Sequence, residues 1–200
     1  RHWLAGLSAL GAAGVLAALP RPARAQSGYP ARPVRLIVGY SAGGAVDAVA
    51  RSVGQALSAS LGQPFVVENK PGAGTNIAVK ATIDAPADGY TLMVTANALA
   101  ANMALYQPAP FDAERDLVAV SLIGRVPVVI AANAGTPYAG IRDLIAAAKA
   151  QPRGIAFASP GNGSTPHMAV EFFERAAGIE LQHVPYRGGA QALTDVIGGQ

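Results

Sequence analysis

The sequence contains no cysteine, which excludes disulfide bonds, iron–sulfur clusters and zinc sites built on thiolates. Of its three histidines, His167 and His183 are too far apart in the sequence to resemble a local pair of metal ligands. We therefore expect no metal and no cofactor. Charge is also scarce: 14% of the 200 residues are charged and 51% are hydrophobic, which suits one large α/β domain or two small ones.

The first 25 residues have the features of a secretory signal peptide. A basic start precedes an uncharged run over residues 3–20, and Ala23-Arg24-Ala25 then forms a small-residue cleavage pattern. This run is shorter than the roughly 20 apolar residues that a membrane span needs. We expect export and cleavage after Ala25, with a retained anchor as the alternative.

The same segment accounts for the net positive charge of the chain. It holds three of the 15 basic residues, Arg1, Arg21 and Arg24, and none of the 12 acidic ones. The remaining residues are therefore balanced in charge, and nothing in them predicts a nucleic-acid partner.

Strand-like and helix-like stretches alternate from residue 29 onward, a pattern typical of a parallel α/β sheet. Most of the strand candidates are nearly continuous apolar runs, as expected for parallel strands covered on both faces. The predicted strands are 34–38, 65–68, 90–95, 118–122, 126–132, 155–158 and 182–184, and the predicted helices are 45–61, 76–85, 97–105, 141–150, 166–177 and 190–197.

Residues 34–47 combine a short buried strand, a glycine turn and the start of a helix. Gly43 and Gly44 let the backbone approach a guest closely. The first N–H groups of a helix have no internal partner, and the helix dipole is positive there, so this turn predicts an anion site.

Three further turns repeat this design at residues 71–76, 159–165 and 186–189. Ligands of parallel α/β sheets bind at the carboxyl ends of the strands. Two of the four turns precede a predicted domain boundary near residue 125, and two follow it. We therefore predict a cleft between two lobes for a small anion. The alternative is that these glycines only form tight connections and helix caps.

The predicted domains are the signal peptide over 1–25, lobe 1 over 26–125 and lobe 2 over 126–200. The chain ends just after Gly198-Gly199 closes a helix. Because no strand follows to complete that unit, we expect the second lobe to be incomplete.

Several single residues have two possible roles. Asp47 can accept hydrogen bonds from its own turn, or it can contact a ligand amine or a bridging water. His167 can cap a helix or pack, or it can take part in catalysis. Arg187 can pair with an anion or remain solvated, and Tyr40 and Tyr186 can line the cleft or pack.

The alternative function is a serine hydrolase. Gly39-Tyr40-Ser41-Ala42-Gly43 matches the G-x-S-x-G nucleophile elbow in a strand–turn–helix context, and His167 or His183 could supply the base. That elbow normally follows several earlier strands, whereas here it follows the first. The chain contains no phosphate-binding P-loop, and no dinucleotide-binding glycine motif fits.

Several longer motifs occur in a fixed order along residues 29–200. They include Gly43-Gly44-x-x-Asp47, Val67-Glu68-Asn69-Lys70-Pro71-Gly72-Ala73-Gly74, Asp88-Gly89-Tyr90-Thr91-Leu92 and His183-Val184-Pro185-Tyr186-Arg187-Gly188. In these motifs the chain resembles the Bug family, the periplasmic solute receptors of tripartite tricarboxylate transporters.

The resemblance implies an α/β, two-lobed periplasmic binding protein of the Venus-flytrap type (type II-like), with the C-terminal return to the first lobe missing here. It implies a monomeric, non-enzymatic periplasmic receptor that holds a small organic carboxylate through main-chain N–H groups, hydroxyls and bridging waters, and delivers it to a membrane permease. The implied ligand-binding residues are Tyr40, Ser41, Ala42, Gly43, Gly44, Asp47, Thr75, Asn76, Thr95, Ala96, Asn97, Ser159, Pro160, Gly161, Asn162, Gly163, Ser164 and Tyr186. Ser41 departs from the family pattern, in which proline or alanine is common, and adds a hydroxyl.

Overall fold

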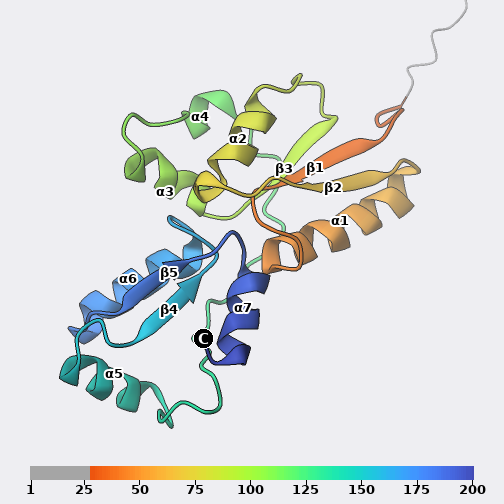
Figure 1. The fold of residues 1–200 in the computed structure, drawn as a ribbon. Coiled ribbons are helices and arrows are strands. Elements are labelled where there is room, and N and C mark those ends of the chain that lie inside the picture. The colour runs from red at the N-terminus through yellow and green to blue at the C-terminus, as the bar shows by residue number, and fades with distance from the viewer. Residues whose placement is uncertain (1–27) are drawn as a thin grey trace, which may run out of the picture.

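The computed structural model describes residues 28–200, so the predicted signal peptide and its cleavage site lie outside the described residues. The described chain forms two α/β units, each built on its own parallel sheet, and the ends of the two sheets approach one another (Figure 1). None of the helices in residues 28–200 is both long and apolar enough to cross a membrane.

The first unit contains a three-stranded parallel sheet in the order β2-β1-β3. The central strand β1 is an apolar run whose Val34, Ile37 and Val38 are fully buried, because strands and helices surround it. The elements of this unit are β1 (Val34–Val38), α1 (Ala45–Leu61), β2 (Phe65–Asn69), η1 (Ala73–Thr75), α2 (Asn76–Ile83), β3 (Thr91–Val94), α3 (Ala98–Leu105) and α4 (Ala113–Asp116).

Helix α1 packs closely on this sheet because of a glycine in its buried face. A Cβ atom at Gly54 would lie 3.1 Å from Leu36 Cδ1 and 3.2 Å from the carbonyl oxygen of Phe65. Ala50, one turn earlier, is fully buried beside Val38. The small residues thus fix the position of α1 and, with it, the turn at its N-terminus.

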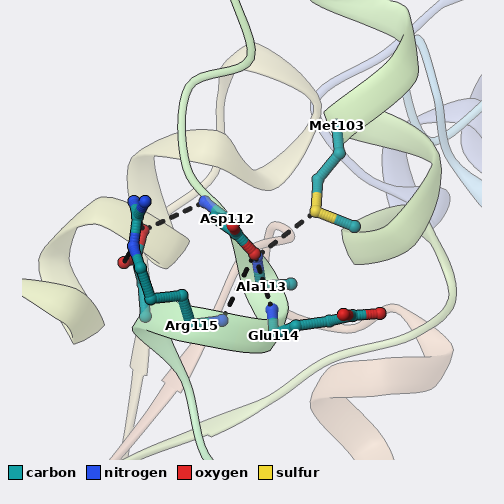
Figure 2. A network of polar contacts seen from close by, with 6 residues as sticks. Met103, Asp112, Ala113, Glu114 and Arg115 are labelled. Carbon is teal, nitrogen blue, oxygen red and sulfur yellow. Dashed lines mark hydrogen bonds and ion pairs between the residues drawn. The ribbon is translucent and has the colours of Figure 1, made fainter.

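The helix α4 has four residues and is stabilised by hydrogen bonds at its N-terminus (Figure 2). The Asp112 carboxylate accepts hydrogen bonds from the backbone N–H groups of Glu114 and Arg115, at 3.1 and 3.2 Å. The Ala113 N–H donates to the Met103 sulfur on α3 at 3.3 Å. The last of these contacts joins α4 to α3.

The second unit contains a two-stranded parallel sheet. Helix α6 begins at the N-cap Ser164 with a proline in its first turn, and Gly178 ends it in the left-handed conformation. The elements of this unit are α5 (Ile141–Ala150), β4 (Ala156–Ser159), α6 (Thr165–Ala177), β5 (Gln182–Pro185) and α7 (Gly189–Gly198). The start of α7 lies beside the start of α1 (Figure 1).

The predicted strands 118–122 and 126–132 are wrong, because this segment has no regular structure. Its apolar side chains are exposed, by 90% at Val118, 80% at Val120 and 77% at Val129. A strand needs a hydrogen-bonding neighbour, and no strand within residues 28–200 pairs with this segment. The domain boundary near residue 125 falls inside it and stays a prediction.

Candidate functional site: a cleft between the two units

A cavity of about 500 Å³ lies where four turns from the two units meet. Each turn follows the carboxyl end of a parallel strand, namely β1, β2, β4 or β5. The four turns predicted from the glycine pattern therefore line one cavity. Its lining consists of Gly39, Tyr40, Pro71, Gly72, Ala73, Gly74, Thr75, Ile77, Tyr106, Pro160, Gly161, Asn162, Ser164, Pro185, Tyr186 and Arg187.

Thr75 is the most unusual residue of this lining. It is only 2% exposed, and its Oγ1 has no hydrogen-bond partner. Its φ of 82° places a β-branched residue in the left-handed region, which is a strained conformation. A buried hydroxyl without a partner is costly, which makes Thr75 a candidate for contact with a guest in the cavity.

On the opposite side, the turn after β4 leads into α6. Ser159 Oγ accepts a hydrogen bond of 3.1 Å from the Gly161 N–H and lies 2.7 Å from His183 Nε2. Gly161 has a φ of 131°, which favours glycine. The turn thus places Gly161, Asn162 and the N-cap Ser164 against the cavity, at the positive end of the helix dipole.

Asp47 anchors the first turn from beneath. Its side chain is almost completely buried and accepts hydrogen bonds from the Gly43 N–H, Arg51 Nε and Asn69 Nδ2, each at 2.9 Å. The hydrogen bond from Arg51 is the main cause that lowers the pKa of Asp47 to about 2, and the bonds from Gly43 and Asn69 add to it against the effect of burial. Asp47 does not line the cavity. These hydrogen bonds are those expected for the structural one of its two possible roles, and ligand contact by Asp47 stays a prediction.

The two units touch directly around the cavity. Ser41 Oγ and the Ser41 N–H both donate to the carbonyl oxygen of Arg187, at 3.0 and 3.2 Å. Asn97 and Thr165 form a second side-chain hydrogen bond between the units. A Cβ atom at Gly188 would lie 2.8 Å from Ser41 Cβ, so the approach of these two turns depends on a glycine.

Both tyrosines predicted for the site line the cavity in their neutral form. Burial raises the pKa of Tyr40 to about 12. The Tyr186 hydroxyl donates to Asp195 Oδ2 at 2.6 Å, and this hydrogen bond is the main cause that raises the pKa of Tyr186. Because the Tyr186 hydroxyl is hydrogen-bonded to Asp195, we infer that Tyr186 lines the cavity with its ring and backbone.

The predicted site residues divide into two groups. Those that line the cavity are Tyr40, Thr75, Pro160, Gly161, Asn162, Ser164 and Tyr186. Those that lie outside its lining are Ser41, Ala42, Gly43, Gly44, Asp47, Asn76, Thr95, Ala96, Asn97, Ser159 and Gly163. Several of the second group support the lining; for example, Asn76 Oδ1 accepts a 2.7 Å hydrogen bond from the buried Asn102. Ligand contact by this group stays a prediction.

Sequence reasoning identified the turn over 71–76 but did not name residues 71–74 as ligand-binding, and it left Arg187 undecided. It missed four other lining residues, Gly39, Ile77, Tyr106 and Pro185. Ile77 is a half-exposed apolar residue in the first turn of α2, and Tyr106 directly follows α3. An exposed apolar residue at a helix start, close to a glycine turn, is the one signal that could have indicated Ile77. Tyr106 carries no local signal, because the packing of α3 alone brings it to the cavity.

The geometry does not favour the hydrolase alternative. A serine nucleophile needs a base within hydrogen-bond reach. The Ser41 hydroxyl is instead bonded to the Arg187 carbonyl, while His183 contacts Ser159 and His167 accepts from the Gly163 N–H. Within residues 28–200 no group of three or more His, Asp or Glu side chains is arranged to hold a metal ion.

Residues 49–200 match the family described as the tripartite tricarboxylate transporter family receptor. The chain belongs to this family. The predicted resemblance to Bug proteins is confirmed, since the chain is 40% identical over 173 residues to the protein BugT of Bordetella pertussis. It is also 36% identical over 172 residues to a protein encoded in the tcbD–tcbE intergenic region of a Pseudomonas species.

Solved structures confirm the periplasmic-binding-protein fold of this family member. The structure of R. palustris Rpa4515 with adipate superimposes with a TM-score of 0.82 at 35% identity. MatC from Rhodopseudomonas palustris with bound malate gives a TM-score of 0.80 at 28% identity. Each match covers 86% of this chain, and they cover 57% and 59% of the two structures.

The chain spans about half the length of the curated relatives it matches, 53% for BugT and 51% for the Pseudomonas protein.

Proposed function

We propose that this chain forms the ligand-binding cleft of a non-enzymatic periplasmic receptor, which captures a small organic carboxylate between its two lobes and delivers it to a tripartite membrane permease. The observation that carries the proposal is a cavity framed by helix starts from both lobes, whose lining includes Thr75 with its buried, unpartnered hydroxyl. We expect the mature receptor to be a monomer in solution.

The charge of the cavity supports an anionic guest. Among the described residues that line it, Arg187 is the one charged side chain, and no acidic residue is present. The start of α6 adds the positive end of a helix dipole. A volume of about 500 Å³ suits a small organic acid.

Two related proteins indicate which acids to test. One structure contains adipate and the other malate, and both of these ligands are dicarboxylates. We use these two acids as probes for this chain.

The test compares each acid with its diamide by calorimetry. A carboxylate gains charge-assisted hydrogen bonds that the neutral amide lacks, so the acid binds and the diamide does not. Equal affinity for acid and diamide would refute carboxylate recognition.

A pair of variants then tests Thr75 itself. Thr75→Val keeps the shape of the side chain but removes the hydroxyl. Loss of one hydrogen bond to a charged group, worth about 1.5–3 kcal/mol, weakens binding by about ten- to a hundredfold. Thr75→Ser keeps the hydroxyl and is the matched control, with binding within a few-fold of the wild type. If Thr75→Val bound the probe acid as tightly as Thr75→Ser does, the hydroxyl would have no part in recognition.

A further inference from the structure

Three of the helices within residues 28–200 begin with the same hydrogen bond. In each, the third helical residue accepts a hydrogen bond from the backbone N–H that precedes the N-cap, as the third residue does in variants of the capping box. In α1 the Gly43 N–H donates to Asp47 at 2.9 Å, and in α5 the Ala139 N–H donates to Asp143 at 3.0 Å. In α6 the Gly163 N–H donates to Nδ1 of His167 at 3.2 Å.

An imidazole differs from a carboxylate at this position in its response to acid. A backbone N–H can only donate, so Nδ1 of His167 must be unprotonated, and the ring proton is assigned to Nε2. Nε2 faces Glu171 Oε1 at 3.5 Å. A second proton on the ring converts Nδ1 into a donor and removes the bond to Gly163, whereas an aspartate remains an acceptor over the same pH range.

The groups around His167 come from three elements. Strand β5 contributes His183, whose ring stacks on that of His167 with centroids 4.1 Å apart, and β4 contributes the uncharged ring of Phe157. Helix α6 itself contributes Glu171. Burial and the neighbouring His167 lower the pKa of His183, against the opposing effect of Glu171, so charge on His183 is disfavoured.

His183 is not the acid-sensitive member of the pair. Its Nε2 lies 2.7 Å from Ser159 Oγ, a hydroxyl that can both donate and accept. A protonated His183 can still donate to Ser159, so this contact survives at either protonation state. Of these two histidine contacts, only the one between Gly163 and His167 involves a backbone N–H, which can donate a hydrogen bond but cannot accept one.

The bond from Gly163 holds a turn that lines the cavity. Gly163 lies between Asn162 and Ser164, which both line the cavity. It is also in tight contact with the first unit, because a Cβ atom at Gly163 would lie 2.5 Å from Asn102 Oδ1. A shift of Gly163 therefore changes both the lining and the fit between the units.

We propose that His167 is a positioning residue whose neutral imidazole holds the 159–164 turn in its binding geometry, so that the receptor loses affinity for its acid ligand when His167 takes up a proton. This inference rests on the proposed function for its effect on affinity, while the effect of acid on the turn can be measured without a ligand.

The ligand-free test uses amide hydrogen exchange of the full chain, followed by NMR at pH 7.5 and 5.5 and corrected for the intrinsic exchange rate. We expect the Gly163 amide to lose protection at the lower pH. The Gly43 amide, held by Asp47 in the equivalent position, is an internal control and keeps its protection. In His167→Asn, whose Oδ1 can replace Nδ1 without titrating, the Gly163 amide keeps its protection at both pH values.

The affinity test measures adipate, or malate if adipate does not bind, by calorimetry at the same two pH values. Because the Gly163 N–H requires an unprotonated Nδ1 on His167, we expect the wild type to bind the acid several-fold more weakly at pH 5.5 than at pH 7.5. We expect His167→Asn to match the wild type at pH 7.5 within about threefold and to lack this loss. We expect His183→Gln, which keeps a polar group near Ser159, to show the same loss of affinity at pH 5.5 as the wild type. Protonation of the acid itself is common to all variants and cancels in the comparison.

The outcomes separate the two proposals. Equal pH dependence of Gly163 protection in the wild type and His167→Asn overturns the inference. Equal pH dependence of affinity in these two proteins overturns it as well. Failure of both acids to bind at pH 7.5 counts against the proposed function, and the exchange measurement then still decides whether His167 holds the turn in an acid-sensitive way.

Discussion

The hydroxyl of Ser41 donates a 3.0 Å hydrogen bond to the carbonyl oxygen of Arg187, 146 residues further along the chain. This hydroxyl joins the two units, and Ser41 is not among the residues that line the cavity. Ser41, the residue that the G-x-S-x-G motif suggested as a nucleophile, thus forms a hydrogen bond between the two turns.

We expect Ser41→Ala to weaken binding of the probe acid by about tenfold or less. The substitution removes one neutral hydrogen bond, worth about 0.5–1.5 kcal/mol, and one decade in affinity corresponds to about 1.4 kcal/mol. The Ser41 N–H still donates to Arg187 at 3.2 Å. Calorimetry with adipate or malate measures the effect. Labelling of Ser41 by a serine-directed probe, together with ester turnover that Ser41→Ala abolishes, would instead establish the hydrolase alternative.

A methyl group between the two turns should prevent closure. In Gly188→Ala the new Cβ atom would lie 2.8 Å from Ser41 Cβ and 3.0 Å from the Ser41 nitrogen, so the turns must separate. Gly188 has an extended φ of 174°, so alanine itself fits the backbone. We expect a loss of affinity of more than about tenfold, because the lobes can no longer meet around the guest. Small-angle scattering with saturating acid should give a larger radius of gyration than the wild type.

Gly189→Ala is the matched control for this substitution. Its Cβ atom would lie 3.8 Å from Pro160 Cγ, which is an ordinary contact. We expect wild-type affinity and a decrease in radius on ligand addition. If Gly188→Ala behaved in the same way, the closure model at these turns would be wrong.

The buried Asp47 predicts a specific dependence of stability on pH. Its pKa is lowered from 3.8 to about 2 in the folded protein, so its contribution is complete above the unfolded value and is lost as the pH falls toward 2. The shift corresponds to about 2 kcal/mol. We expect Asp47→Asn to lower the free energy of unfolding at pH 7 by about this amount, measured by urea denaturation.

The difference between wild type and Asp47→Asn should shrink between pH 4 and 2, where the wild-type carboxylate becomes protonated. Asp143→Asn removes the equivalent cap from the exposed start of α5 and should cost less at pH 7. A constant difference between wild type and Asp47→Asn across this pH range would show that the carboxylate charge is not what stabilises the turn.

The elements with strong local signals could be predicted from the sequence. The prediction for β1 matches the structure at both ends, and the prediction for α1 does as well. Apolar periodicity and helix caps are encoded within a few residues of each element, which explains this agreement. The glycine turns were predictable for the same reason, and their convergence followed from the rule that parallel strands end at one edge of a sheet.

Features that depend on distant partners could not be predicted. The contact of α4 with the Met103 sulfur of α3 joins residues ten positions apart, and the segment over 117–133 has the composition of strands without a neighbouring strand in the described chain. The strained φ of Thr75 is likewise invisible, since a β-branched residue rarely adopts it and only the surrounding turn imposes it. The sequence also could not show which of the two adjacent glycines in the first turn has a positive φ. In the structure it is Gly43, at 84°, whereas Gly44 has a φ of −83°.

The composition of the cavity wall divides it into two parts with different freedom to vary. The glycines around Thr75, Gly72 and Gly74, have positive φ values of 126° and 60°, so a larger residue at either position disturbs the turn. Ile77 and Tyr106 project from helix ends and have no such constraint. If the proposed function holds, substitutions at Ile77 and Tyr106 can change the length or polarity of the acid that the receptor prefers. The turns that contact the carboxylate then keep their conformation.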